Sequence, residues 1–157
     1  MKLATVPIHR YDHRQLQGEI TIDTELIVRA VAEAAIGETE FVNGIAAMSA
    51  SGQYGPPRAC AGIVGFADLS LGVNVGPILD AHMALSRRFR GIRHAAGWDA
   101  SDAVRNSQTN PPSHLLADDT FRQGVAELEK RNLSFDAWLY HLQIPELVEL
   151  AQDFPSL

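Results

Sequence analysis

One nearly continuous apolar run stands near the middle of the sequence: Ala59-Cys60-Ala61-Gly62-Ile63-Val64-Gly65-Phe66-Ala67, closed by Asp68. Its apolar residues do not recur at helical spacing, so the run lacks the stripe of an amphipathic helix. Strands that are buried on both faces have this composition, and they belong to parallel sheets covered by helices. The run therefore predicts a buried strand in an α/β fold.

The residues after this run alternate between helical and strand patterns. We predict a helix over 77–90, a strand over 91–95, a helix from 118 or 119 to about 131, a strand over 133–139 and a helix over 145–153. Such alternation is typical of parallel strands joined by right-handed crossovers. It fits either an open, flavodoxin-like sheet or part of a barrel. No glycine-rich phosphate turn follows the first strand to favour a nucleotide site.

The residues before the run are predicted to be mainly helical. Lys2 to Ile8 has the pattern of a short strand. Asp23 or Thr24 can cap a helix that ends at Gly37. A second helix is predicted from Glu38 to Ser51.

The sequence has 157 residues and a formal net charge of -6, a size that fits one domain. A surface of that sign repels phosphate backbones, which argues against nucleic-acid binding. The apolar runs are too short for a membrane span or a secretion signal. Cys60 is the single cysteine, and we expect it to be a buried, inert thiol. These features predict a single domain over 1–157 in the cytoplasm.

Four stretches carry a further pattern: Gly37-Glu38-Thr39-Glu40-Phe41-Val42-Asn43-Gly44-Ile45-Ala46-Ala47, Ala61-Gly62-Ile63-Val64-Gly65-Phe66-Ala67-Asp68-Leu69, Phe89-Arg90-Gly91-Ile92-Arg93-His94 and Leu133-Ser134-Phe135-Asp136-Ala137-Trp138-Leu139-Tyr140. In this order and spacing they resemble the amidohydrolase-related TIM-barrel hydrolases, a group that includes lactonases. The last three resemble that family's third, fourth and fifth barrel strands. The resemblance covers about 37–157, whereas 1–36 match the family poorly.

The resemblance implies a partial (β/α)8 TIM barrel with about three consecutive parallel strand–helix units, preceded by helices. It also implies a hydrolase for a lactone, ester or amide of a small carboxylated compound. The family's first-strand histidine pair, sixth-strand histidine and late aspartate have no counterpart here, and a closed barrel needs about 250 residues. We therefore expect a truncated barrel with little hydrolysis of its own and no evident cofactor. A divalent metal is expected only in a full-length relative.

Polar residues at the carboxyl ends of the predicted strands form the candidate site, because barrel enzymes place their reacting groups there. Arg93 is expected to bind a substrate carboxylate or lactone carbonyl, and His94 to hydrogen-bond the same group. Tyr140 is expected to donate to an oxyanion, with His141 beside it as a binding residue. The alternatives are an ion pair at Arg93 and a helix-start cluster packed on Trp138.

Three more residues complete the predicted binding site. Asp68 either orients a neighbouring side chain or caps the following loop. Asp136 lies within its strand, where Arg93 on the adjacent strand is its natural partner. Trp98 lies in a long loop over 96–117 and is a candidate pocket wall.

No metal site is predicted. His9 and His13 could share a helix face and bind a metal, but no third ligand follows at a recognisable spacing. His82 and His114 are most simply structural or exposed. The alternative to a hydrolase is a non-catalytic half-barrel that self-associates or binds a partner, because unpaired strand edges and apolar patches seek partners.

Overall fold

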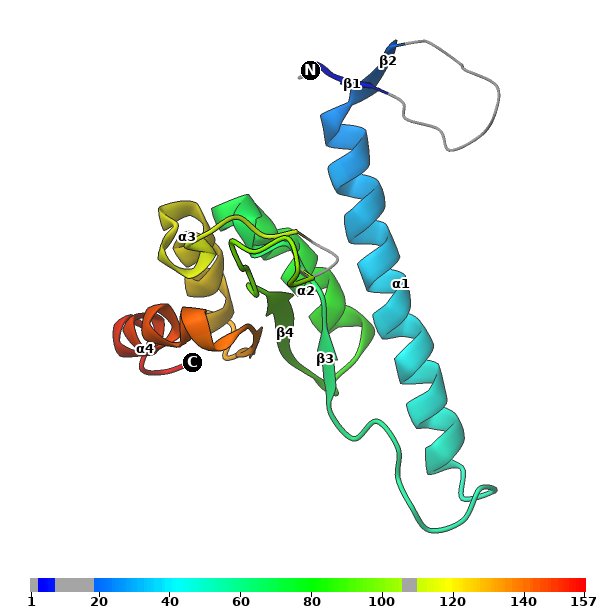
Figure 1. Ribbon diagram of the computed structural model, residues 1–157. Coiled ribbons are helices and arrows are strands. Elements are labelled where there is room, and N and C mark those ends of the chain that lie inside the picture. Colours follow the sequence, from blue (N-terminus) through cyan, green and yellow to red (C-terminus); the bar gives the residue numbers. More distant parts are fainter. Residues whose placement is uncertain (1–2, 8–18, 106–109) are drawn as a thin grey trace. The chain divides into compact units, whose positions relative to one another are not determined.

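The computed structural model describes residues 3–7, 19–105 and 110–157, with side chains from residue 33 onward. The chain falls into two compact units, Met1–Ala34 and Ala35–Leu157. Figure 1 labels helices α1–α4 and strands β1–β4.

The first unit begins with two antiparallel strands. β1 (Leu3–Pro7) pairs with β2 (Glu19–Asp23), and Leu3 lies opposite Asp23. β1 agrees with the strand predicted over 2–8. β2 is an addition to the predicted elements, although its sequence alternates polar and β-branched residues in the way that strands do.

One helix, α1 (Thr24–Ala50), replaces the two helices predicted on either side of Gly37. The predicted break at Gly37 is wrong. A glycine inside a helix costs only about 1 kcal/mol relative to alanine. Ala35, Thr39 and Ala46 are buried on both sides of the glycine, so packing along this helix outweighs the local cost.

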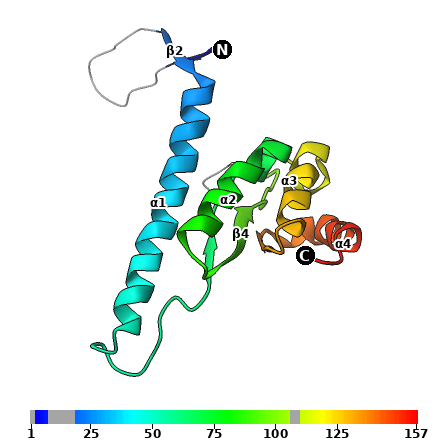
Figure 2. The same cartoon turned by 180° about the vertical axis from the view of Figure 1, so that it is seen from behind.

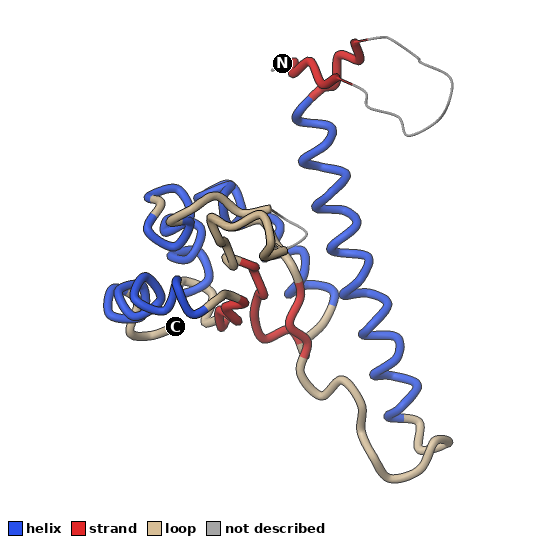
Figure 3. Tube along the Cα trace, viewed as in Figure 1, coloured by secondary structure: helices blue, strands red, loops and turns tan. Residues whose placement is uncertain are grey.

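Three parallel strands form the centre of the second unit (Figure 3). They are β3 (Ile63–Gly65), β4 (Phe89–Ala95) and β5 (Ser134–Trp138), in the order β3-β4-β5. Both pairs are parallel, which confirms the predicted α/β class. Within the described residues this sheet has three strands and does not close, and its origin as a partial TIM barrel stays a prediction.

A helix follows each strand of this sheet. α2 (Gly76–Leu85), α3 (Asp119–Glu129) and α4 (Ile144–Asp153) correspond to the three predicted helices. Short 3₁₀ helices precede them: η1 (Leu69–Val75), η2 (Leu115–Ala117) and η3 (His141–Gln143). Asp118 caps α3 as predicted, because its carboxylate accepts a hydrogen bond from the Phe121 N–H at 2.8 Å.

The end of α2 differs from the prediction that this helix reaches Arg90. Ser86 is extended, with φ -149° and ψ 122°, and Phe89 and Arg90 belong to β4 instead. The Ser86 hydroxyl accepts a hydrogen bond from the Arg88 N–H at 3.1 Å. This local bond offers the backbone an alternative to another helical turn.

β3 is also shorter than the strand predicted over 59–67. Cys60 has a φ of 54°, in the left-handed region, which an extended strand does not allow. The pairing with β4 also shifts register between Ile63 and Val64. Cys60 is half-buried rather than buried, which corrects the predicted environment of its thiol.

Side chains along β4 divide between a buried and an exposed face of the sheet. The buried ones are Phe89, Ile92 and His94, and the exposed ones are Arg90 and Arg93. Two residues rather than one separate Phe89 from Ile92, because the register shift against β3 adds a residue to β4 at this point. After the shift the alternation is regular.

Helices α2 and α3 cover the buried face. His82 of α2 stacks on Phe89, with ring centres 4.8 Å apart. Phe121 of α3 meets His94 edge-on, with 5.1 Å between the ring centres. Figure 2 shows α2 in front of the strands from this side. Consecutive strands with right-handed crossovers explain the arrangement, because each crossover then returns on the same side of the sheet.

Candidate functional site

The opposite face of the sheet carries an ion pair between neighbouring strands. The parallel register places Arg93 of β4 opposite Asp136 of β5. Asp136 Oδ2 accepts hydrogen bonds from Arg93 Nε at 2.9 Å and from Arg93 Nη2 at 2.5 Å. This confirms the predicted pairing of the two residues. The Arg93 and Asp136 side chains are 62% and 38% exposed, so solvent can reach both.

Trp138 extends this face toward the carboxyl end of β5. It lies two residues after Asp136, and side chains two apart share a face of a strand. Trp138 is 42% exposed. Its ring contacts Tyr140 with 5.5 Å between ring centres. Gly97 approaches so closely that a Cβ there would lie 2.8 Å from the Trp138 ring.

Hydrogen bonds connect the segment after β4 to the end of β5. The Ala96 N–H donates to the Trp138 carbonyl at 2.8 Å. The Tyr140 hydroxyl donates to the main-chain carbonyl of Arg105. A phenol has one O–H, so in this arrangement the hydroxyl predicted to stabilise an oxyanion already has an acceptor.

Gln143 joins the same two segments, and the sequence reasoning missed it. Its Nε2 donates to the Trp98 carbonyl at 2.8 Å. Its Oε1 accepts from the Tyr140 N–H at 3.1 Å and from the Trp98 N–H at 3.4 Å. The side chain is 5% exposed. The available signal was a polar residue between a strand end and Pro145, but its partner Trp98 is distant in sequence.

His94 lies away from Arg93, on the helix-covered face. Its Nδ1 accepts a hydrogen bond from the Leu69 N–H at 3.3 Å, and its ring is 4% exposed. Burial lowers the pKa of His94, while the charge of Asp68 and a backbone hydrogen bond with Ala67 oppose that shift. His94 is therefore a neutral packing residue here. The two neighbours do not converge on one group, contrary to the prediction.

Asp68 and His141 flank the ends of their strands. The Asp68 carboxylate caps η1 by accepting a hydrogen bond from the Ser70 N–H at 3.0 Å, which is the capping role considered from the sequence. His141 is exposed at the start of η3. Trp98 is half-buried in the loop after β4, and Gln143 holds its backbone rather than its ring.

His82 has the structural role expected from the sequence. Its Nε2 lies 3.1 Å from the Phe66 carbonyl, so Nε2 carries the hydrogen. Its Nδ1 then accepts from the Thr39 hydroxyl at 2.9 Å. Burial lowers the pKa of His82, and the hydrogen bond with Phe66 opposes the shift. The ring thus ties α1 and α2 to the end of β3.

His114 makes a side-chain contact with Glu146 that the sequence did not indicate. Its Nδ1 lies 2.8 Å from Glu146 Oε1 at the start of α4. The histidine is 78% exposed and the glutamate 17%. The contact joins the loop before α3 to α4 and lies in neither of the predicted groups of site residues.

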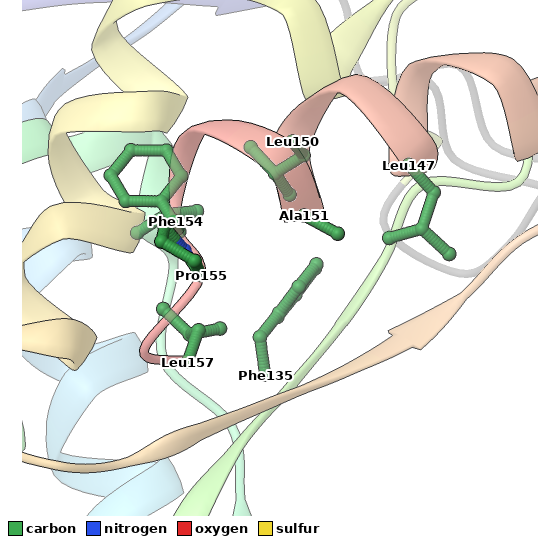
Figure 4. Close-up of a pocket in the computed structure, with 8 residues that line it drawn as sticks. Phe135, Leu147, Leu150, Ala151, Phe154, Pro155 and Leu157 are labelled. Atoms are coloured by element: carbon green, nitrogen blue, oxygen red, sulfur yellow. The ribbon is translucent and has the colours of Figure 1, made fainter.

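An apolar pocket lies on the helix-covered side of β5. Its volume is about 310 Å³, and its lining residues are Val125, Phe135, Leu147, Leu150, Ala151, Phe154, Pro155 and Leu157. Figure 4 shows the side chains of α4 facing Phe135 across this space. Phe135 precedes Asp136, so the pocket and the ion pair lie on opposite faces of the strand.

The part of the chain that the structure describes holds no group of three histidine, cysteine, aspartate or glutamate side chains arranged for a metal ion. His9 and His13 lie outside the described residues. No helix found there is long and apolar enough to cross a membrane.

Comparison with known proteins gives one relative of unknown activity. The chain is 38% identical over 121 residues to the uncharacterized protein y4mH of Sinorhizobium fredii (strain NBRC 101917 / NGR234). The match covers 77% of this chain and 36% of the relative, so the chain spans about a third of that protein's length. No family model matches the chain, and no solved structure matches it.

Proposed function

We propose that the open face of β4 and β5 binds the carboxylate of a small substrate in a barrel hydrolase of the amidohydrolase-related type. The substrate would be a lactone, ester or amide. One observation carries the proposal: Arg93 lies in the carboxyl-terminal half of the parallel strand β4, and its exposed guanidinium is hydrogen-bonded to Asp136. Parallel α/β folds bind their ligands at that end of the sheet.

Arg93 has hydrogen-bond donors left for a ligand. A guanidinium has five N–H donors, and two of them point at Asp136. A carboxylate can accept hydrogen bonds from the remaining donors in a charge-assisted pair. Trp138 beside the pair offers apolar ring surface. The site therefore suits a compact ring that carries a carboxylate.

In this proposal, the open face of the sheet binds the substrate and polarises its carbonyl group. Arg93 can also stabilise negative charge that develops on a lactone carbonyl oxygen. His94 lies on the other face, and the Tyr140 hydroxyl donates to Arg105. No proton transfer is assigned to His94 or Tyr140 here, and their catalytic roles stay predictions.

A pair of lactones that differ in one carboxylate tests this function. We would titrate 5-oxotetrahydrofuran-2-carboxylate and γ-butyrolactone, following tryptophan fluorescence for binding and a pH-stat for hydrolysis. The carboxylated lactone should bind about tenfold more tightly, since a hydrogen bond to a charged group is worth about 1.5 kcal/mol or more. Arg93→Met should remove that preference.

Arg90→Met is the matched control for this experiment. Arg90 is also exposed on β4, but its guanidinium donates to the main-chain carbonyls of Arg87 and Phe89 at 2.8 Å each. This variant should keep the preference for the carboxylated lactone. Equal affinity of the wild-type protein for both lactones would contradict the proposed function.

Self-association is the second candidate, favoured by apolar side chains exposed on two helices of the second unit. Ile144 and Val148 of α4 are 50% and 51% exposed, and Phe41 and Met48 of α1 are 70% and 50% exposed. Members of each pair lie four or seven residues apart, so each pair shares a helix face. A second copy of the chain would cover them.

Light scattering across a concentration series tests self-association. A dimer mass for the wild type that becomes a monomer mass in Val148→Lys would support an α4 interface. Lys is placed on a half-exposed helix position, so the fold should tolerate it. A monomer mass for the wild type at every concentration would exclude this candidate.

A further inference from the structure

The two segments that carry the tryptophans of the chain form one hydrogen-bonded assembly at the carboxyl ends of β4 and β5. Trp138 is on β5 and packs against Gly97, and Trp98 follows directly in the chain. Side-chain bonds join the two segments through Gln143 and Tyr140. The assembly adjoins the Arg93 and Asp136 pair because Ala95, two residues after Arg93, pairs with Trp138 in the register.

We propose that Gln143 is a positioning residue that fixes the backbone of residues 96–98 as one wall of the carboxylate site. Its amide uses both ends: the Nε2 group donates to Trp98, and Oε1 accepts from Trp98 and Tyr140. Glutamine is suited to this position because the backbone of Trp98 presents both an N–H donor and a C=O acceptor. As far as it concerns ligand binding, the inference rests on the proposed function.

The burial of Gln143 makes this assignment specific. At 5% exposure the amide has little access to water, and an unpaired buried amide is unfavourable. The two bonds to the Trp98 N–H and C=O groups therefore hold the backbone on both sides of Trp98 in place, and the third bond connects it to Tyr140. Without them, the contact of Gly97 with Trp138 and the bond from Ala96 to the Trp138 carbonyl remain as anchors.

Two substitutions separate the bonds of Gln143. Gln143→Leu removes all three and replaces the amide with an apolar side chain of similar size. Gln143→Glu keeps an oxygen that accepts from the Trp98 and Tyr140 N–H groups, but it loses the donor to the Trp98 carbonyl. Gln152→Leu is the control, because Gln152 is an exposed residue on α4.

Amide hydrogen exchange at Trp98 is the first measurement, and it needs no ligand. The Trp98 N–H should exchange about tenfold faster in Gln143→Leu than in the wild type, because the N–H loses its acceptor. Gln143→Glu should fall between the two, and Gln152→Leu should match the wild type. Unchanged exchange at Trp98 in Gln143→Leu would overturn the inference.

Binding of 5-oxotetrahydrofuran-2-carboxylate is the second measurement, with a thermal melt alongside. Gln143→Leu should bind this lactone several-fold more weakly at a temperature where it is fully folded. The neutral leucine variant carries this comparison, because the carboxylate of Gln143→Glu would itself repel the ligand. A folded Gln143→Leu protein that binds as the wild type does would overturn the link to the site. If the wild type binds no carboxylated lactone, the proposed function fails, and the exchange at Trp98 still decides whether Gln143 fixes the loop.

Discussion

At the scale of single residues, the candidate site is governed by competition for Arg93. Asp136 holds the guanidinium and also neutralises its charge. A substrate carboxylate would approach both the guanidinium and the aspartate, so its affinity is reduced by the like charge. An exposed ion pair of this kind contributes at most about 1 kcal/mol. A ligand carboxylate can therefore compete with Asp136 for the Arg93 guanidinium, and removing the charge of Asp136 should change the affinity by a measurable amount.

Asp136→Asn should strengthen binding of the carboxylated lactone by about threefold to fivefold, the equivalent of roughly 0.5–1 kcal/mol. Asparagine keeps an acceptor for Arg93 but removes the negative charge. Affinity for γ-butyrolactone should stay the same, which serves as the internal control. Weaker binding of the carboxylated lactone would mean that Asp136 itself contacts the ligand.

The two buried histidines predict how stability depends on pH. Burial lowers the pKa values of His82 and His94 below their ordinary value of 6.5, so the unfolded chain binds protons first as the pH falls. The free energy of unfolding should be highest above about pH 6.5 and should decrease below it until the folded-state pKa values are passed. Urea unfolding at pH 7.5, 6.5 and 5.5 measures this.

His82→Gln tests the contribution of one histidine. A glutamine amide can accept from Thr39 and donate to the Phe66 carbonyl but does not titrate. The slope of the unfolding free energy between pH 6.5 and 5.5 should decrease by up to about 1.4 kcal/mol per pH unit. The same slope in the variant and the wild type would show that His82 is not the titrating group.

The residue scale also shows where sequence reasoning reached its limit. The partnership of Arg93 with Asp136 follows from adjacent strands, and it is confirmed. The burial of His94 could not be derived in the same way. Alternation along a strand places His94 and Arg93 on opposite faces of the sheet, but it does not show which of the two faces the helices cover. Gln143 was missed because its role depends on which distant loop lies opposite it.

At the scale of secondary structure, close packing decides between local preferences. A Cβ at Gly124 in α3 would lie 2.2 Å from the Leu69 carbonyl oxygen, whereas a Cβ at Gly37 in α1 would meet nothing within 4 Å. Helix propensity favours alanine over glycine at both positions. The surroundings of the two glycines therefore predict that substitution by alanine stabilises the protein at Gly37 and destabilises it at Gly124.

Gly37→Ala should raise the free energy of unfolding by about 0.5–1 kcal/mol. Gly124→Ala should lower it by about 1–3 kcal/mol, because η1 and α3 must separate to admit the methyl group. Denaturant unfolding of both variants beside the wild type measures the two changes. A stabilised Gly124→Ala protein would contradict the contact between α3 and η1.

The order of strands and helices after residue 59 could be predicted from the sequence, whereas the residues at which several of these elements begin or end could not. Composition and periodicity identify the buried strands and the amphipathic helices, since those patterns are local. Ser86 and Cys60 end their elements through backbone conformations that no neighbouring pattern indicates. Gly37 was predicted to end a helix, but burial on both sides of it keeps α1 continuous.

At the scale of the second unit, the division of the sheet into a covered and an open face determines where the core, the pocket and the candidate site lie. The covered face holds the core, the two neutral histidines and the apolar pocket. The open face holds the ion pair and Trp138. One side of a parallel sheet with its helices is what a sector of the predicted barrel would provide, and the proposed carboxylate site lies on the opposite side of the sheet from helices α2 and α3.

The most direct test of the central claim is nuclear magnetic resonance of the Arg93 side chain. We would follow the Nε–H resonance of Arg93, assigned with Arg93→Lys, during titration with 5-oxotetrahydrofuran-2-carboxylate and then with γ-butyrolactone. A ligand bound by the guanidinium should move this resonance saturably with the carboxylated lactone and leave it in place with the uncharged one. A resonance that stays in place with both lactones, or moves equally with both, would contradict carboxylate binding by Arg93.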